Sequence, residues 1–101
     1  MPTAKKSVTY RRRGAAGILT LHGAIDMFEA SAFHESAQKA LHDTQAKSVT
    51  IELTGAERLD MSALQILRAL RRDLAEAGRA VEIASPSSRV LSDAAASGMS
   101  L

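Results

Sequence analysis

The stretch Glu57-Arg-Leu-Asp-Met-Ser-Ala-Leu-Gln-Ile-Leu-Arg-Ala-Leu-Arg-Arg72 marks a change from strand to helix. Before it, apolar and polar residues alternate, which is the period of a half-buried strand; the apolar ones are Val49, Ile51 and Leu53. Within and after it, apolar residues recur every three or four positions, as on one face of a helix; these are Leu64, Leu67, Leu70, Leu74 and Ala77. The pattern predicts a strand over residues 48–53, a departure from it over 54–58, and a helix over about 63–77.

Asp60 and Ser62 stand where this strand gives way to this helix. The first amides of a helix are unpaired and carry positive partial charge, so an anion is stabilised there. Ser62 is therefore a candidate phosphoryl acceptor. It also has a purely structural interpretation, because Ser62 to Gln65 reads Ser-x-x-Gln, the capping-box pattern, a role that contributes about 1 kcal/mol. The two roles are compatible, and the spacing leaves both open.

Strand alternation and helical spacing also predict the positions of the other strands and helices. Asp26 is a candidate N-cap or near-cap of the first helix, with Glu29 as its capping-box partner. Ser85 and Pro86 predict the start of a last helix, with serine as the cap and proline in the first helical position. The predicted elements are strands at 7–13, 17–22, 48–53 and 79–84 and helices at 28–43, 63–77 and from 85 to about 98. The order β-β-α-β-α-β-α predicts an α/β fold, a mixed four-stranded sheet covered by helices.

Composition sets the class of protein. A chain of 101 residues, 46% apolar and 24% charged, is expected to form one domain over residues 1–101, with residues 1–6 as a flexible basic tail. There is no cysteine, which excludes disulfides, thiol catalysis and cysteine-based zinc sites. No run approaches the roughly 20 apolar residues of a membrane span, and no signal-peptide core follows the basic N-terminus. We expect a cytoplasmic protein.

The net charge of +2 comes from one edge of the chain. Residues 1–14 contain no acid and five bases, which leaves the rest slightly acidic; the bases are Lys5, Lys6, Arg11, Arg12 and Arg13. Nucleic-acid binding usually needs a broad basic face, so we expect no direct nucleic-acid partner.

Patterns for catalysis are weak. Neither a phosphate-binding loop nor a dinucleotide-binding glycine pattern occurs, and the three histidines lack a metal-ligand spacing. A triad of Ser62, His22 and either Asp60 or Asp26 lacks the nucleophile-elbow sequence, and so short a chain leaves little room for a substrate pocket. We expect a binding protein with no enzyme activity, no metal and no cofactor.

Four segments together resemble the STAS domains (sulfate transporter and anti-sigma factor antagonist). They are Leu21-His-Gly-Ala-Ile-Asp26, the run from Leu53 to Leu67, Ala77-Gly-Arg-Ala-Val-Glu-Ile-Ala84, and Ser85-Pro-Ser-Ser-Arg-Val-Leu91 with the closing Ser97-Gly-Met99. The similarity runs from about Ile18 to Met99. The best known members are bacterial anti-anti-sigma factors, that is, anti-sigma factor antagonists.

The resemblance implies roles for particular residues. Ser62 matches the serine or threonine that an anti-sigma kinase phosphorylates, Asp60 the acid two residues before it, and Asp26 the acid of the first loop. Met61 and Ala63 depart from the family, which commonly has a small or hydroxyl residue and a glycine there. By this resemblance the chain binds a serine kinase/anti-sigma factor, is released when Ser62 is phosphorylated, and is reset by a serine phosphatase. The implied partner-binding residues are Asp26, Asp60, Met61, Ser62, Ala63 and Gln65.

Two other roles are open to a single STAS domain. The first is a non-switching subunit of an ABC-type membrane lipid transporter, docked on its ATPase. The second is an adaptor encoded in a chemotaxis or two-component gene cluster, which the run Leu64-Gln-Ile-Leu67 resembles.

Overall fold

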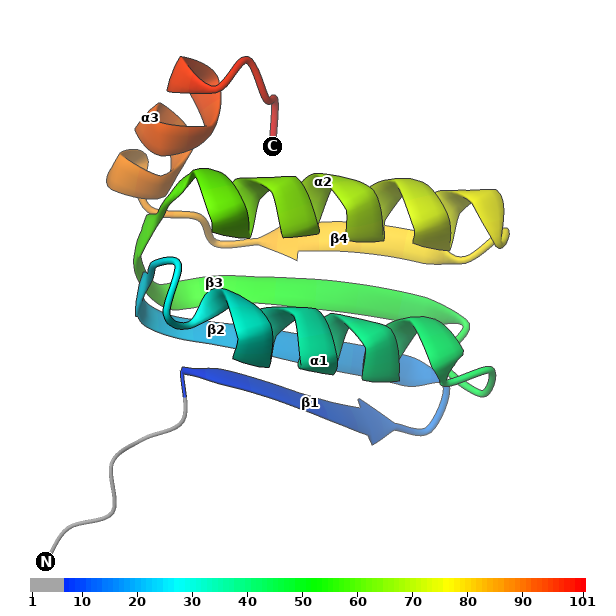
Figure 1. Ribbon diagram of the computed structural model, residues 1–101. Coiled ribbons are helices and arrows are strands. Elements are labelled where there is room, and N and C mark those ends of the chain that lie inside the picture. The colour runs from blue at the N-terminus through cyan, green and yellow to red at the C-terminus, as the bar shows by residue number, and fades with distance from the viewer. Residues whose placement is uncertain (1–6) are drawn as a thin grey trace, which may run out of the picture.

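The computed structural model describes residues 7–101, so the predicted basic tail at residues 1–6 lies outside the described residues. Over that range the elements follow the predicted order (Figure 1). They are β1 (Val8–Arg13), β2 (Ala16–Ile25), α1 (Ala30–His42), β3 (Ser48–Leu59), α2 (Met61–Glu76), β4 (Ala80–Ala84) and α3 (Ser88–Ala96). The predicted α/β fold with a mixed four-stranded sheet is confirmed.

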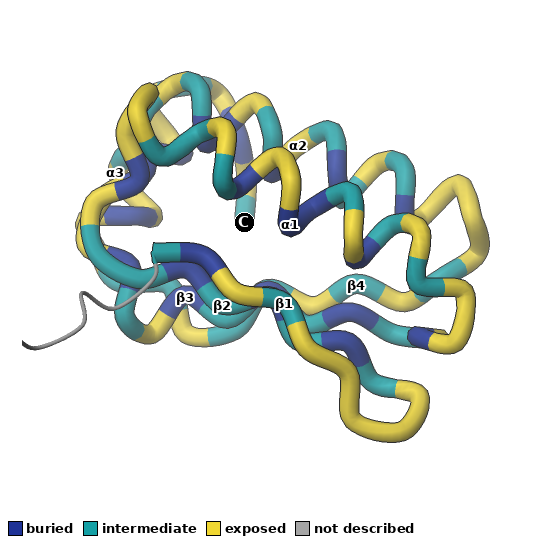
Figure 2. The backbone as a smooth tube through the Cα atoms, turned by 60° about the horizontal axis from the view of Figure 1, so that its bottom comes forward, coloured by how far each residue is buried: buried dark blue, intermediate teal, exposed yellow. Residues whose placement is uncertain are grey.

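The sheet has the order β1-β2-β3-β4. β1 runs antiparallel to β2, as expected for a hairpin, and β2, β3 and β4 are parallel. Figure 2 shows α1 and α2 side by side over one face of the sheet, and the other face carries no helix from the described part of the chain. α3 lies beyond the end of β4, next to the far end of β3 (Figure 1). The carboxyl ends of β2 and β3 therefore lie at one edge of the molecule.

The core lies between the sheet and the pair α1 and α2. Its strand residues alternate with residues on the uncovered face, and its helix residues follow the predicted stripes. Phe33 of α1 is completely buried. The other large side chains with less than 2% exposure are Leu19, Leu21, Ile25, Val49, Ile51, Leu53, Leu59, Leu67, Leu74 and Val90.

β2, which ends at Ile25, and β3 are both longer than the sequence predicts. β3 continues to Leu59, so the prediction that residues 54–58 leave the strand is wrong. The pairing of β2 with β3 shifts register between Thr20 and His22 and again between Gly23 and Ala24, where Gly23 adopts a left-handed φ of 78°. These irregularities change which residues face the core, so the buried positions after Leu53 are three apart and the period of two is lost.

The start of α3 also differs from the prediction. Ser87, not Ser85, is the N-cap, and its hydroxyl oxygen accepts from Val90 N–H at 3.1 Å. Ser85 instead has a left-handed φ of 53° in the connection from β4. The later start places Val90 and Ala94 four residues apart on the buried face of α3. Packing against β3 therefore selects among serines that are locally equivalent as caps.

A polar network closes the end of the molecule opposite the carboxyl ends of β2 and β3. The Arg79 guanidinium donates to backbone carbonyls that follow α1 or end it, at 2.7–3.0 Å; these belong to Ala40, Leu41, Asp43 and Ala46. The Asp43 carboxylate accepts from the Tyr10 hydroxyl at 2.8 Å and from Arg12 at 3.0 Å. The network joins β1, α1 and the start of β4.

Because the Tyr10 hydroxyl donates to Asp43, the free energy of unfolding depends on pH in the alkaline range. Burial and the hydrogen bond to Asp43 raise the pKa of Tyr10 from 10.0 to about 12. The folded state therefore holds the phenolic proton more tightly, and this stabilisation is complete below pH 10 and is lost between pH 10 and about 12.

We predict that Tyr10→Phe lowers the free energy of unfolding by about 1 kcal/mol at pH 8, because one hydrogen bond is lost. The difference from wild type should narrow as the pH rises from 10 to 12, since only the wild type loses a phenolic proton. Urea unfolding of both proteins across this range measures it. A difference that does not change with pH would contradict the assignment.

Candidate functional site

Two strand-to-helix turns meet at the edge where β2 and β3 end. The ladder between these parallel strands runs to the pair Ile25 and Leu59. One residue further, the Asp60 N–H donates to the Ile25 carbonyl at 3.1 Å. This bond sets the turn that begins with Asp26 directly beside the turn that contains Asp60. The structure thus brings together the two aspartates that the sequence analysis selected 34 positions apart.

Asp60, not Ser62, is the N-cap of α2. Its backbone is extended, with φ −82° and ψ −177°, and its Oδ1 accepts from the Ala63 N–H at 3.1 Å. Ser62 is the second residue of the helix. The capping box of Ser62 with Gln65 is therefore wrong. A carboxylate two positions earlier reaches the third-residue amide, and its charge also interacts favourably with the helix dipole.

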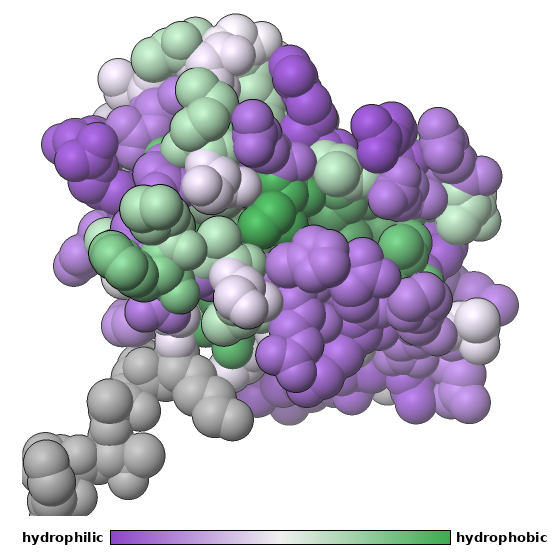
Figure 3. Space-filling model, viewed as in Figure 1, coloured by the Kyte–Doolittle hydropathy of each residue, from purple (hydrophilic) through white to green (hydrophobic). Residues whose placement is uncertain are grey.

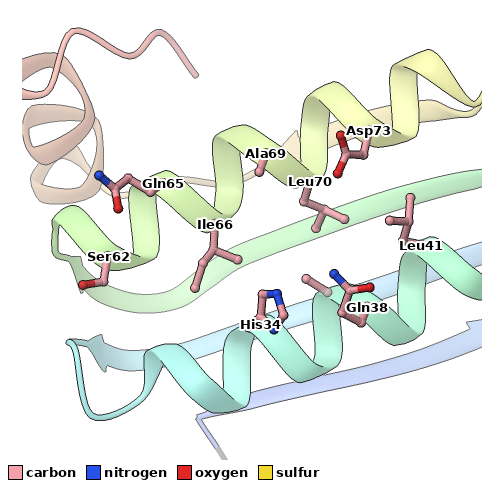
Figure 4. A pocket seen from close by; sticks show the side chains of 10 residues that line it. His34, Gln38, Leu41, Ser62, Gln65, Ile66, Ala69, Leu70 and Asp73 are labelled. Atoms are coloured by element: carbon pink, nitrogen blue, oxygen red, sulfur yellow. The ribbon is translucent and has the colours of Figure 1, made fainter.

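Ser62 is partly exposed in the first turn of α2. Figure 4 shows its hydroxyl pointing away from the helix, at one end of a groove between α1 and α2. It therefore lies at the amino end of a helix, on the surface, where a hydroxyl is accessible to a second protein.

The groove beside Ser62 has a volume of about 410 Å³. Leu41, Ile66 and Leu70 give it apolar walls (Figure 4). The remaining lining residues are His34, Ala37, Gln38, Gln65, Ala69 and Asp73. Sequence periodicity could not find the groove, because it exists only where α1 packs beside α2.

Asp26 organises the turn before α1. Its Oδ1 accepts from the N–H groups of Phe28 at 2.9 Å and Glu29 at 3.2 Å, so the prediction of a near-cap is confirmed. Glu29 does not complete a capping box: it is itself the N-cap residue and makes no side-chain cap bond. Its carboxylate accepts instead from the Ser7 hydroxyl at 2.6 Å. The Asp26 turn fixes the backbone of Met27 and Phe28 outside the helix.

Large apolar side chains are exposed around this site. Phe28 is 84% exposed, Met27 67% and Met61 58%. We call these three residues the apolar rim. Figure 3 shows apolar side chains gathered at this end of the molecule. Because large contiguous apolar patches on a protein surface often mark interaction sites, the apolar rim is a candidate partner contact. Of the three, the family resemblance selected only Met61. Met27 and Phe28 could have been found as large apolar residues in the turn that follows Asp26 and precedes α1.

The catalytic and metal-binding arrangements considered from the sequence are not assembled. His22 is half-buried on β2, where its ring lies against Gly55 of β3, whereas Ser62 belongs to the helix layer. Among residues 7–101, no group of three or more His, Asp or Glu side chains could hold a metal ion. In the same range, no helix is both long enough and apolar enough to span a bilayer.

Comparison with known proteins agrees with this architecture. The family model described as "Mlab, STAS domain" matches residues 8–100. No curated protein sequence matches the chain. Among solved structures, an anti-sigma factor antagonist from Mycobacterium paratuberculosis superposes with a TM-score of 0.78 at 20% identity, covering 96% of this chain and 83% of that one. The Bacillus cell fate determinant SpoIIAA in its phosphorylated form gives 0.72 at 13% identity, covering 91% and 84%. Both likenesses show the fold alone.

A third structure, that of Mglu, superposes with a TM-score of 0.71 at 26% identity. The match covers 84% of this chain but only 21% of Mglu. This fold therefore also occurs as a part of a much longer protein.

The capping assignment predicts different stabilities for two alanine variants. Asp60→Ala should lower the free energy of unfolding by about 1 kcal/mol, because the Ala63 amide loses its acceptor. Ser62→Ala should change it by less than about 0.5 kcal/mol, since alanine suits the first turn of a helix and no cap is lost. Chemical unfolding followed by circular dichroism compares them. The reverse order would restore Ser62 as the cap.

Proposed function

Because the chain belongs to the STAS domain family, we propose that it is an anti-sigma factor antagonist that acts by partner switching. It binds a serine kinase/anti-sigma factor when Ser62 is free and is released when Ser62 is phosphorylated. One observation carries the proposal: the Ser62 hydroxyl is accessible at the amino end of α2, beside the turn of Asp26 and the apolar rim. The mycobacterial anti-sigma factor antagonist has the same fold, which is compatible with this role.

The fold tolerates a phosphate on Ser62. Phosphorylation adds about −1.5 to −2 charge at pH 7. At the second helical position this charge gains about 0.3–1 kcal/mol from the helix dipole. The neighbouring Asp60 carboxylate opposes it, but both groups are solvated in the free protein, where such repulsion is screened. The two effects are of similar size, so α2 should remain folded.

A complex centred on the same site does not tolerate the phosphate. In the proposed complex the partner covers Ser62 together with the apolar rim, so the new charge loses water beside its chain neighbour Met61 and close to Asp60. Burying an uncompensated charge is strongly unfavourable. A penalty of about 3 kcal/mol would weaken binding roughly 100-fold. Desolvation at the interface therefore drives release, while the fold is unchanged.

The proposed division of labour places the chemistry on the partner. This chain supplies the acceptor hydroxyl, and the kinase supplies nucleotide, Mg²⁺ and the groups that position them. Met61 and Gln65 are exposed and belong to the proposed docking surface with Asp26 and Asp60. Ala63, which the family resemblance also implied as a partner-binding residue, is fully buried and supports the first turn of α2 from within the fold. We place the reaction in the cytoplasm, where a serine phosphatase would remove the phosphate and renew binding.

We predict that the protein gains one phosphoryl mass when it is incubated with ATP and the kinase/anti-sigma protein encoded beside it. Ser62→Ala should gain none, because the acceptor oxygen is absent. Ser92→Ala is the matched control, since Ser92 is an exposed serine on α3 that the proposal does not use, and it should behave as wild type. Intact-mass spectrometry measures all three. No gain on wild type, or an equal gain on Ser62→Ala, would refute the acceptor role.

A second candidate is the non-switching subunit docked on the ATPase of a membrane lipid transporter. The apolar rim favours it, because permanent interfaces are more apolar than transient ones. The description of the matching family model is "Mlab, STAS domain" and does not mention an antagonist. Membership in the family is therefore compatible with either role.

Ser62→Asp separates the two candidates. A switching antagonist should lose at least about tenfold in affinity for its kinase/anti-sigma partner, less than for phosphoserine because aspartate carries a single charge. Ser62→Asn, of similar size but neutral, should lose little. Titration calorimetry against the kinase and against the ATPase measures both variants. Tight binding of Ser62→Asp to the ATPase, with none of wild type to the kinase, would establish the second candidate instead.

A further inference from the structure

β3 has two different neighbours along its length on the side away from β2. β4 pairs with it only from Ser48 to Glu52, yet β3 continues to Leu59. Over the remaining residues, the described part of the chain offers α3 in place of a strand, and α3 packs against β3 there (Figure 1). A helix cannot continue the ladder of a sheet, so the backbone groups at this end of β3 need other acceptors.

Asp93 of α3 supplies one such acceptor. Its Oδ2 accepts from the Leu59 N–H at 3.2 Å. Successive N–H groups of a strand point to opposite sides, and the next one, that of Asp60, donates to Ile25 of β2. The last residues before α2 are therefore held from both sides, by β2 through Asp60 and by α3 through Leu59.

The hydrogen bond, and not an ion pair, is the important contact of Asp93. The Asp93 side chain is 15% exposed, whereas its two arginine neighbours are more than half exposed. Arg89 lies 3.4 Å and Arg58 3.9 Å from its oxygens. Exposed ion pairs of this kind contribute little. Leu59 is 1% exposed and no strand pairs with it on this side, so the Asp93 carboxylate is the acceptor that satisfies a buried N–H.

We propose that Asp93 is a positioning residue for Ser62. By holding the Leu59 N–H, it fixes the Asp60 cap and through it the first turn of α2, which carries the acceptor hydroxyl. The consequence for phosphorylation rests on the proposed function of Ser62. Transfer between two positioned groups is sensitive to small displacements of either one. Asp93 therefore acts on the reaction from a third helix, without contacting Ser62 or the docking surface.

Amide hydrogen exchange on the isolated protein tests the contact. In Asp93→Ala, the amides of Leu59 and Asp60 should exchange at least about tenfold faster than in wild type, while that of Ile51 keeps its rate. Asp93→Asn retains a side-chain oxygen that can accept the bond and should exchange within about twofold of wild type. Arg89→Ala removes an ion pair only and should also match wild type.

Three exchange results would overturn the proposal. They are unchanged rates at Leu59 in Asp93→Ala, equal acceleration at every core amide, which would indicate general destabilisation, and an effect of Arg89→Ala as large as that of Asp93→Ala.

Kinase kinetics test the consequence. Asp93→Ala should lower kcat for Ser62 phosphorylation about tenfold and leave KM within about twofold, because the apolar rim and Asp26 still dock. Asp93→Asn should restore kcat. Faster exchange with an unchanged kcat, or a loss confined to KM, would overturn the positioning role. If wild type gains no phosphoryl group, the proposed function fails, and the exchange rates still decide whether Asp93 holds the segment.

Discussion

The hydrogen bond from the Asp60 N–H to the Ile25 carbonyl is the contact on which the site depends. It extends the parallel pairing of β2 and β3 by one step, into the turns that start α1 and α2. Parallel strands end at the same edge, so this pairing places two helix starts, two capping aspartates and one hydroxyl side by side. Each of these features is local in origin. Their proximity exists only because the two strands are neighbours.

The two ends of the molecule differ in how their polar and apolar side chains are used. At one end, Arg79 binds four carbonyls around the end of α1, and Asp43 joins Tyr10 and Arg12. Polar groups there satisfy one another within the fold. At the other end, the carboxylates of Asp26 and Asp60 are used for capping, and large apolar side chains face solvent. These exposed apolar side chains are the ones that a docked partner would bury in the proposed complex.

Prediction from the sequence succeeded where a single period or a local bond decides the structure. The leucines of α2 and the alternation in β3 up to Leu53 define their elements, and Asp26 bonds to amides two and three residues away. It failed where several residues could fill the same local role. Ser62 and Ser85 each fit a capping pattern, but Asp60 and Ser87 are used. Capping patterns are short and degenerate, and packing of the helix face against the sheet selects among them.

Spacing within single segments is enough to give the order of the elements, the apolar faces that form the core, and the presence of a hydroxyl near the start of α2. Other features depend on how the elements pack: the extension of β3 to Leu59, the groove between α1 and α2, the exposure of Phe28, and the contact of Asp93 with Leu59. These features join residues that are distant in the chain or depend on what a neighbouring element leaves uncovered. No periodicity within a segment carries that information.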